Sequence, residues 1–231
     1  MSGHVSALEI VKQTRRQGSV YGDFINAARD TIFGASSSGT DAGVDYSTPT
    51  AVGRWGVGIL STGSTSTGRA SHVASSGTNE KQAFGGNRIV FECDFTMPVL
   101  PASGDQFSFR AGFNDSNTRS GLVDGIFYEV DYSSGERHRL IFFSNSGETP
   151  VTLTGVPTTG RHILTLVIDA TAANVYCYID DVLVGSGSSG IPTGNSRLAC
   201  ASIGVEKTVG NTEVRIEIDW CAIAMGFGSA R

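Results

Sequence analysis

Two neighbouring stretches decide the fold: Arg161-His162-Ile163-Leu164-Thr165-Leu166-Val167-Ile168-Asp169 and Val175-Tyr176-Cys177-Tyr178-Ile179-Asp180-Asp181-Val182-Leu183-Val184-Gly185. Both are rich in β-branched and aromatic residues, which is typical of strands. The residues 170–174 between them predict a turn. Asp180-Asp181 predicts a second turn, which leads into a third short strand. Three consecutive strands are therefore expected here.

Strand patterns of this kind continue through residues 84–227. Gly, Pro and Asn punctuate them at regular intervals, which favours an antiparallel two-sheet sandwich over alternating strands and helices. Two strands have clear inward-facing sets. The first set is Ile89, Phe91, Cys93 and Phe95, and the second is Val214, Ile216, Ile218, Trp220 and Ala222. The predicted strands cover residues 87–95, 105–114, 121–132, 139–144, 149–153, 161–169, 174–179, 197–206 and 213–225.

Composition agrees with an all-β protein that is rich in turns. The 231 residues include 30 glycines, with 17% charged and 39% hydrophobic residues. This length suits one large β domain with an appendage. The net charge of -5 and the scattered Lys and Arg residues argue against nucleic-acid binding, which needs a clustered basic surface.

Membrane insertion and the usual secretory route are not expected. The chain has no apolar run near the length of a membrane span and no basic, apolar, small-residue signal at its start. These features predict a soluble protein made in the cytoplasm.

The N-terminal residues 1–34 carry the helical signal of the chain. Tyr21, Phe24, Ile25, Ala28 and Ile32 fall at the spacing of one apolar helix stripe, and Gly34 is placed to end the helix. A weaker helical stretch precedes it at residues 5–16. We therefore predict a short helical arm, which either packs on the sandwich or anchors the chain to a larger assembly.

Residues 35–83 form a bridge rich in Gly, Ser and Thr, which taken alone suggests a linker. However, Trp55, Val57 and Ile59 alternate with the period of a half-buried strand. The bridge is therefore expected to contribute one or two strands. A lectin-like sandwich is expected over residues 84–231.

The fold-deciding segments resemble the late strands of concanavalin-A/laminin-G-like jelly rolls. The resemblance rests on His162 to Asp169, on Val175 to Val184 and on the closing segment Val214 to Trp220. In that family Gly usually stands where this chain has Asp181. The resemblance implies a jelly-roll fold, and it leaves function open because members bind sugars, hydrolyse them or build structure.

A second resemblance concerns the bridge. Its phrase from Leu60 to Ala70 is similar to one in tailed-bacteriophage virion proteins that carry lectin-like sandwiches. This resemblance implies that the chain is a structural component of a phage particle.

Metal and nucleophile motifs are absent from the sequence. Cys93, Cys177, Cys200 and Cys221 form no short-spaced pair, so buried free thiols or one disulfide are expected instead of a zinc site. The four histidines form no metal-binding pair, and no acidic loop supplies most ligands of a Ca²⁺ site. We predict no metal and no cofactor.

Three predicted strands contain Glu-x-Asp, at Glu92-Cys93-Asp94, Glu129-Val130-Asp131 and Glu217-Ile218-Asp219. Two such carboxylates point to one face about 7 Å apart. The middle motif resembles the Glu-x-Asp-x-x-Glu of laminarinase-type jelly-roll hydrolases, but Ser133-Ser134 follow where a second Glu is needed. Solvent-facing acids without a catalytic role are the prediction, because glycoside hydrolysis requires both carboxylates.

Sugar binding would use aromatic rings with polar neighbours. The tyrosines alternatively cover an intersubunit seam, and the sequence leaves both readings open. The candidates for a glycan site are Tyr128, Tyr132, Tyr176, Tyr178, Asn114, Asp115, Arg119 and Asn145.

Together the resemblances imply a non-enzymatic surface protein of a phage virion, synthesised in the host cytoplasm. It would contact other virion proteins through its arm and form a homo-oligomer, with a trimer favoured. Two roles fit: capsid decoration or head fibre, and a tail-fibre adhesin that binds host cell-surface glycan. The alternative is a secreted or virion-associated glycan hydrolase.

Overall fold

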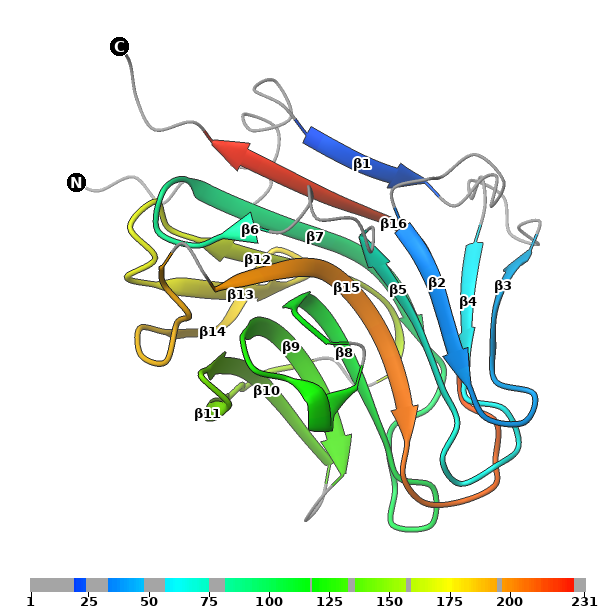
Figure 1. The fold of residues 1–231 in the computed structure, drawn as a ribbon. Helices are drawn as coiled ribbons and strands as arrows, with labels where there is room; N and C mark the ends of the chain where they lie inside the picture. Colours follow the sequence, from blue (N-terminus) through cyan, green and yellow to red (C-terminus); the bar gives the residue numbers. More distant parts are fainter. Residues whose placement is uncertain are drawn as a thin grey trace.

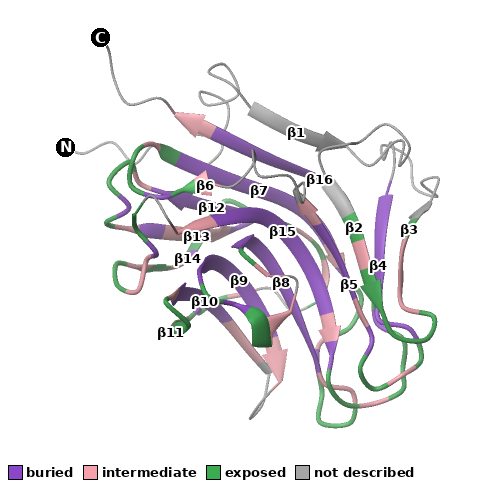
Figure 2. Cartoon of the chain, viewed as in Figure 1, coloured by how far each residue is buried: buried purple, intermediate pink, exposed green. Residues whose placement is uncertain are grey.

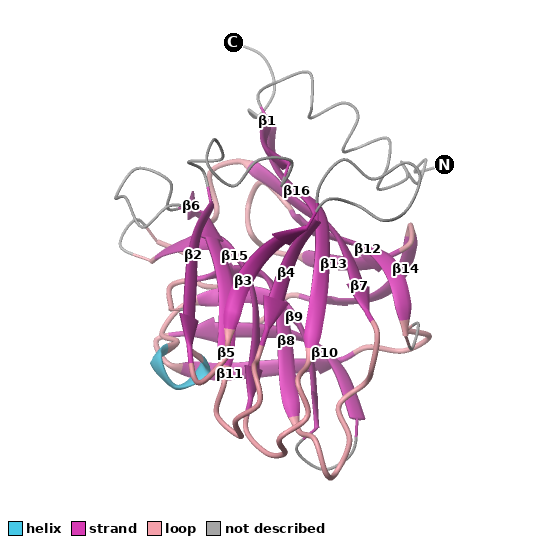
Figure 3. Ribbon diagram, turned by 90° about the vertical axis from the view of Figure 1, so that its right-hand side faces the viewer, coloured by secondary structure: helices cyan, strands magenta, loops and turns pink. Residues whose placement is uncertain are grey.

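The computed structural model describes residues 19–23, 33–47, 57–74, 82–116, 118–132, 136–156, 159–194 and 197–226. The 3-10 helix η1 at Arg119–Gly121 is the one helix in these ranges (Figure 3). The strands are β1 Ser19–Asp23, β2 Phe33–Ser38, β3 Gly43–Ser47, β4 Val57–Ser61, β5 Arg69–Ala74, β6 Gln82–Ala83, β7 Arg88–Met97, β8 Phe107–Asn114, β9 Gly125–Tyr132, β10 Glu136–Ser144, β11 Gly147–Thr152, β12 Gly160–Ile168, β13 Val175–Ile179, β14 Val182–Gly187, β15 Leu198–Lys207 and β16 Arg215–Gly226.

The strands form two antiparallel sheets that pack face to face (Figure 1). Sheet A has the order β14-β13-β12-β7-β16-β4-β3, and β1 also pairs with β16. Sheet B has the order β11-β10-β9-β8-β15-β5-β2, and β6 also pairs with β15. The predicted all-β, two-sheet antiparallel sandwich is confirmed.

The fold-deciding segments form β12, β13 and β14 as predicted, at one side of sheet A. Val167 on β12 lies opposite Tyr176 on β13. The turn between β13 and β14 places Asp180 and Asp181 at φ angles of 51° and 65°, in the left-handed region. Asp is among the residues that tolerate this region, so Asp181 can replace a glycine there. The Asp180 Oδ1 atom also accepts a 2.8 Å hydrogen bond from the Ile163 N–H, which holds the turn against β12.

The core lies between the sheets, and Figure 2 shows buried residues along the central strands of both. On β7 the predicted inward set from Ile89 to Phe95 is at most 1% exposed. The ring of Phe95 lies 4.9 Å from the ring of Phe109 on β8, so aromatic contacts join the two layers. All four cysteines are buried free thiols.

A bulge in β16 changes the predicted inward set of that strand. Ile216 and Ile218 face the core, but the register shifts between Ile218 and Trp220. One extra residue in a strand reverses which side chains face inward. Cys221 and Ile223 therefore belong to the core, in place of the predicted Trp220 and Ala222.

The predicted N-terminal helical arm is not supported. Tyr21 lies in β1, opposite Ala222 of β16. Pairing with β16 provides hydrogen-bond partners for the backbone of this segment, and this outweighs its helical spacing of apolar residues. Phe24, Ile25, Ala28 and Ile32 lie outside the described residues. Within the described ranges, no helix is long and apolar enough to cross a membrane.

The bridge contributes more strands than predicted. Residues 35–83 contain β3 to β6 and most of β2, and these strands join both sheets. Ser-rich β2 has little strand propensity of its own, yet all its residues from Phe33 to Ser38 pair with β5. Its neighbour in the sheet therefore decides its conformation, which composition alone could not indicate.

Candidate functional site

A row of alternating charges crosses the outer face of sheet B, which is the hollow side of this curved sheet in Figure 1. Arg110 on β8 lies opposite Glu129 on β9, and Glu129 lies opposite Arg139 on β10. These side chains alternate along their strands with core residues such as Tyr128 and Val130. The strand period therefore places all three charges on the face that points away from the core.

Short hydrogen bonds join these charges into one network. Arg139 Nη2 donates to Glu129 Oε2 at 2.6 Å and to Asp131 Oδ2 at 2.9 Å. Arg110 Nη2 donates to Glu206 Oε2 on β15 at 2.8 Å. Charge-assisted bonds of this kind fix the positions of their side chains closely.

Arg119 reaches this network from outside the sheet. It belongs to η1, in the loop between β8 and β9, and its Nη1 atom donates to Glu129. Its Nη2 atom donates to Glu148 Oε2 at 2.8 Å, and its backbone N–H donates to Glu206 Oε2 at 3.2 Å. Arg119 therefore links carboxylates from three different strands.

The loop that carries Arg119 is fixed to the sheet by apolar packing and by hydrogen bonds. Leu122 forms a buried cluster with Phe127, Ile141 and Phe143 on the outer face of β9 and β10. Asp124 Oδ1 accepts hydrogen bonds from the Asn145 N–H at 3.1 Å and from Arg197 Nη1 at 3.0 Å. The loop therefore covers one part of the face and leaves the rest open.

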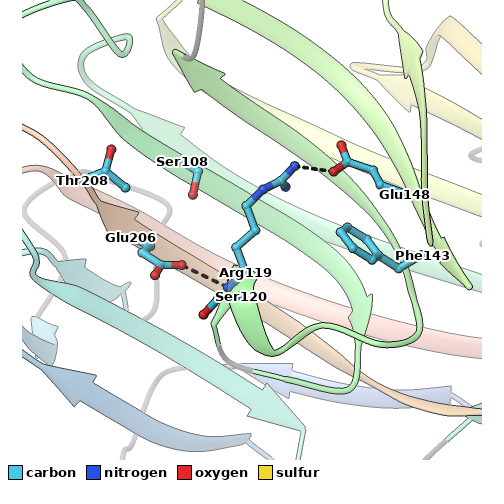
Figure 4. A pocket seen from close by; sticks show the side chains of 7 residues that line it. All are labelled: Ser108, Arg119, Ser120, Phe143, Glu148, Glu206 and Thr208. Atoms are coloured by element: carbon cyan, nitrogen blue, oxygen red, sulfur yellow. Dashed lines mark hydrogen bonds and ion pairs between the residues drawn. The ribbon is translucent and has the colours of Figure 1, made fainter. Parts of the chain in front are cut away.

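A pocket of about 460 Å³ opens beside Arg119 (Figure 4). This volume falls in the range of small-ligand sites. The Phe143 ring lies under the Arg119 guanidinium carbon, 5.9 Å from the ring centroid. The lining thus combines carboxylate, hydroxyl and guanidinium groups with one aromatic ring. The lining residues are Ser108, Arg119, Ser120, Phe143, Glu148, Glu206 and Thr208.

Burial sets the electrostatics of the network. Glu129 is 0% exposed, and desolvation raises the pKa of its carboxyl above its ordinary value although Arg119 and Arg139 favour its charged form. Burial likewise lowers the pKa of the Arg110 guanidinium. Glu206 partly offsets this effect. The network therefore holds its charges largely out of water.

Part of the hydrogen-bonding capacity of the network remains unused. Nε and Nη1 of Arg110, Nε of Arg139 and Oδ1 of Asp131 are buried and bond to none of the described residues. Most buried polar atoms in folded proteins have a partner, so unused ones call for an explanation. These four atoms are therefore candidates for contacts with a ligand or with water.

One predicted glycan-site residue, Arg119, lines the pocket. Tyr128 is wrong as a candidate, because it is 1% exposed in the core and its hydroxyl lies 2.8 Å from His138 Nδ1. Tyr176 and Tyr178 lie on the outer face of sheet A, on the other side of the sandwich.

The remaining candidates border the Arg119 loop or the end of β9. Asn114 is buried at the end of β8, and Asp115 Oδ1 accepts a 3.1 Å hydrogen bond from the Val123 N–H. Asn145 lies in the turn after β10 with a φ of 58°. Tyr132 is half-buried at the end of β9. These four residues lie outside the pocket lining.

The expectation of solvent-facing acids is wrong for Glu129, which is fully buried and bonded to two arginines. It is also wrong for Glu92, Asp94 and Asp219, which are buried in sheet A. The sequence contained a signal that could have revealed the burial of Glu129. Glu129-x-Asp131 and Arg137-x-Arg139 flank one hairpin, and Asp131 pairs with Arg137 as Glu129 pairs with Arg139. Alternating acids beside alternating arginines predict a cross-strand ion network.

Solved structures of one carbohydrate recognition domain and two enzymes have a sandwich similar to this one. The carbohydrate recognition domain of Emp46p superposes with a TM-score of 0.59 at 10% identity, covering 88% of this chain and 94% of that one. The Bacillus licheniformis β-glucanase gives 0.53 at 14% identity, covering 90% and 98%. The Crh5 transglycosylase gives 0.57 at 14% identity, covering 89% and 83%.

The chain has the concanavalin-A-like jelly-roll fold. This confirms the fold implied by the sequence resemblance. At these identities the likeness shows the fold alone. No protein-family model matches the chain, and no curated protein matches it in sequence. The similar structures give no indication of a phage virion protein.

The prediction that the chain is not an enzyme is wrong, because the similar structures include enzymes. Structures with this fold include a β-glucanase and a transglycosylase, so the fold is compatible with glycan chemistry as well as with glycan recognition. The acids that carried the exclusion are also not simple surface acids, since Glu129 is buried within the charged network. Enzymatic activity must therefore be decided at the site itself.

Proposed function

We propose that the outer face of sheet B binds a glycan in the pocket beside Arg119. The observation that carries this proposal is the pocket itself, where Arg119, Glu148 and Glu206 converge over a buried charged row. Glycan recognition by the Emp46p domain and glycan chemistry by the β-glucanase support it, because both proteins share this fold.

The pocket offers what sugar recognition needs. Carboxylates accept hydrogen bonds from sugar hydroxyls, while the guanidinium and the hydroxyls of Ser108 and Thr208 can donate to them. Arg119 is already held by Glu129 and Glu148. A group that is fixed before binding loses less conformational freedom when a ligand arrives, so this arrangement favours affinity.

A glycan array followed by titration tests the proposal. The full chain should bind at least one polysaccharide, and Arg119→Ala should weaken that binding by about tenfold or more, or ~1.4 kcal/mol. Arg215→Ala is the matched control, because Arg215 is a half-exposed arginine on β16 of sheet A. Absence of any saturable glycan binding, or equal losses in the two variants, would contradict the proposed site.

Hydrolysis of the bound glycan is a second candidate, favoured by the crowding of carboxylates. Arg139 contacts Glu129, Asp131 and Glu148, so three carboxylates surround one guanidinium. Glycoside hydrolysis uses two carboxylates about 5 to 9.5 Å apart. Release of reducing ends from a bound polysaccharide, lost in Glu148→Gln, would support this candidate. Binding without such release would leave recognition alone.

The virion location and the homo-oligomeric state, with a trimer favoured, remain predictions from the sequence. Copy number in purified particles would test the location. Light scattering of the purified chain would test the oligomeric state. A few copies at a tail would fit an adhesin that binds host glycan, whereas hundreds on a lattice would fit capsid decoration.

A further inference from the structure

One arginine on the outer face of sheet B takes no part in the charged network. Arg69 on β5 lies directly opposite Glu206 on β15. The next residue, Ala70, belongs to the core, so strand alternation points Arg69 to the outer face. Glu206 directs its Oε2 atom to Arg110 and to the Arg119 N–H instead. The Nε atom of Arg69 is buried without a hydrogen-bond partner, and none of the ion pairs between described residues involves Arg69.

Among the described residues of this face, buried donors without a partner outnumber buried acceptors without one. The atoms concerned are Nε of Arg69, Arg110, Arg137 and Arg139, Nη1 of Arg110, Oδ1 of Asp131 and Oδ1 of Asn114. A guanidinium group only donates hydrogen bonds, whereas the two oxygens accept them. Buried polar atoms in folded proteins usually have a partner, so the surplus of donors favours a ligand that supplies acceptors.

The described charged side chains of this face leave a positive excess, although the whole chain has a net charge of -5. The arginines are Arg69, Arg110, Arg119, Arg137 and Arg139, and the carboxylates are Glu129, Asp131, Glu148 and Glu206. Each carboxylate is already bonded to at least one arginine. Arg69 therefore adds a charge that no carboxylate of this set balances, and a negatively charged group beside it is favoured.

Arg69 lies beside the pocket that holds Arg119. Glu206 lines this pocket, and residues at opposite positions of antiparallel strands have Cβ atoms about 5 Å apart. In the sheet order β15 lies between β8 and β5, so Arg110 and Arg69 come from the strands on the two sides of Glu206 (Figure 1). Arg69 is half-buried, so part of its side chain is open to solvent. A ligand in the pocket therefore comes close to a second guanidinium.

We propose that the glycan bound in this pocket is acidic and that Arg69 binds one of its carboxylate or sulfate groups. This inference rests on the proposed glycan site and adds the charge of the ligand to it. Both groups are negative and only accept hydrogen bonds, and their oxygens match the planar fork of a guanidinium. A neutral sugar offers hydroxyls that donate as well as accept, and it leaves the charge of Arg69 without a counterpart.

Pairs of glycans that differ only in charge test this inference on the unaltered full chain. Uronate oligosaccharides are compared with the methyl esters of the same chains, and sulfated oligosaccharides with their desulfated forms. The acidic member of at least one pair should bind about tenfold more tightly, the size expected for an added hydrogen bond between charged groups. Raising the ionic strength from about 0.05 to about 0.5 M should reduce this preference, because salt screens charges near the surface. The type of pair that shows the preference distinguishes a carboxylate from a sulfate.

The variant Arg69→Gln, measured on the preferred pair, tests the role of this side chain. It should bind the acidic glycan about tenfold more weakly than the wild type does, and the neutral counterpart equally well. Arg215→Gln is the matched control, because it changes a half-exposed arginine on sheet A, and it should bind both members as the wild type does.

Three results would overturn the inference, and they differ in what they leave standing. Equal affinity for the two members of every pair, with binding still lost in Arg119→Ala, would exclude an acidic ligand and keep the glycan site. An acidic preference that Arg69→Gln does not reduce would exclude the role of Arg69. Absence of saturable binding to every member would contradict the glycan site and this inference together.

Discussion

The two outer faces of the sandwich bury charged side chains in different ways. On sheet B the charges pair with one another, and a loop anchored by Leu122 covers only part of the face. On sheet A, half-exposed Arg161 forms ion pairs with buried Asp94 and Asp219, beside the apolar cluster of Val90, Val167 and Ala224. Sheet B keeps a pocket beside its network, whereas on sheet A those three buried side chains form a small apolar cluster. The comparison supports the proposed ligand site on sheet B, because the pocket lies beside that network.

The largest expected effect is on sheet B. Glu129→Ala removes the fully buried partner that Arg119 and Arg139 share, and leaves Arg139 with Asp131 and Glu148 alone. Loss of one partner in a buried ion network costs about 3 to 5 kcal/mol. Urea denaturation should show a loss of this size in the free energy of unfolding.

The corresponding change on sheet A, Asp94→Asn, provides the comparison. Its partner Arg161 is 49% exposed, so the freed guanidinium can turn to water. The free energy of unfolding should therefore fall by less, about 1 to 3 kcal/mol. If Asp94→Asn cost as much as Glu129→Ala, the contrast between a closed network and a water-accessible one would be lost.

A histidine in the core between the two faces should make the stability of the protein depend on pH. His72 on β5 is fully buried, and burial lowers the pKa of its imidazole from 6.5 to about 4. The folded state then binds fewer protons than the unfolded state between these values. Stability that is fully present above pH 6.5 is lost as pH falls toward 4, by about 3 kcal/mol in all.

Chemical denaturation across this pH range checks the effect of His72. The variant His72→Gln lacks the titrating ring, so it should lose this part of the pH dependence. An unchanged slope in that variant would show that the acid sensitivity comes from the carboxylate networks on the two faces.

The smallest expected change in stability comes from removing the hydroxyl of a tyrosine in the core. Tyr128→Phe removes the hydrogen bond to His138 and should cost about 1 kcal/mol of stability. Glycan binding should remain unchanged, because Tyr128 has no access to the pocket. Tyr178→Phe, on the outer face of sheet A, is the matched control. A large loss of glycan affinity in Tyr128→Phe would place the ligand somewhere else.

Much of the fold could be predicted from the sequence, because period-2 patterns such as the one from Ile89 to Phe95 set which side of a strand is buried. The bulge near Asp219 could not be predicted, since one inserted residue leaves no mark in the pattern it reverses. Strand β2 was missed for another reason. Its Ser-rich sequence is paired by β5, and pairing between distant segments is not visible in local composition.

The candidate site was predicted only through Arg119. Stacking of sugars on aromatic rings favours the tyrosines, but alternation along β9 points Tyr128 into the core and Glu129 to the outer face. The absence of a second Glu in the same strand predicts acids without a role in a site. Glu148 and Glu206 come from β11 and β15, and only the sheet order brings them to Arg119.

An amide NMR titration of the isotope-labelled full chain, with the oligosaccharide that it binds best on an array, locates the ligand on one of the two sheets. Chemical-shift changes are expected at Ser108, Arg119, Phe143, Glu148 and Glu206, which line the pocket. Amides of Tyr176 and Tyr178 on sheet A should not shift. Shifts confined to sheet A, with the pocket amides unmoved, would contradict the assignment of sheet B as the ligand-binding face.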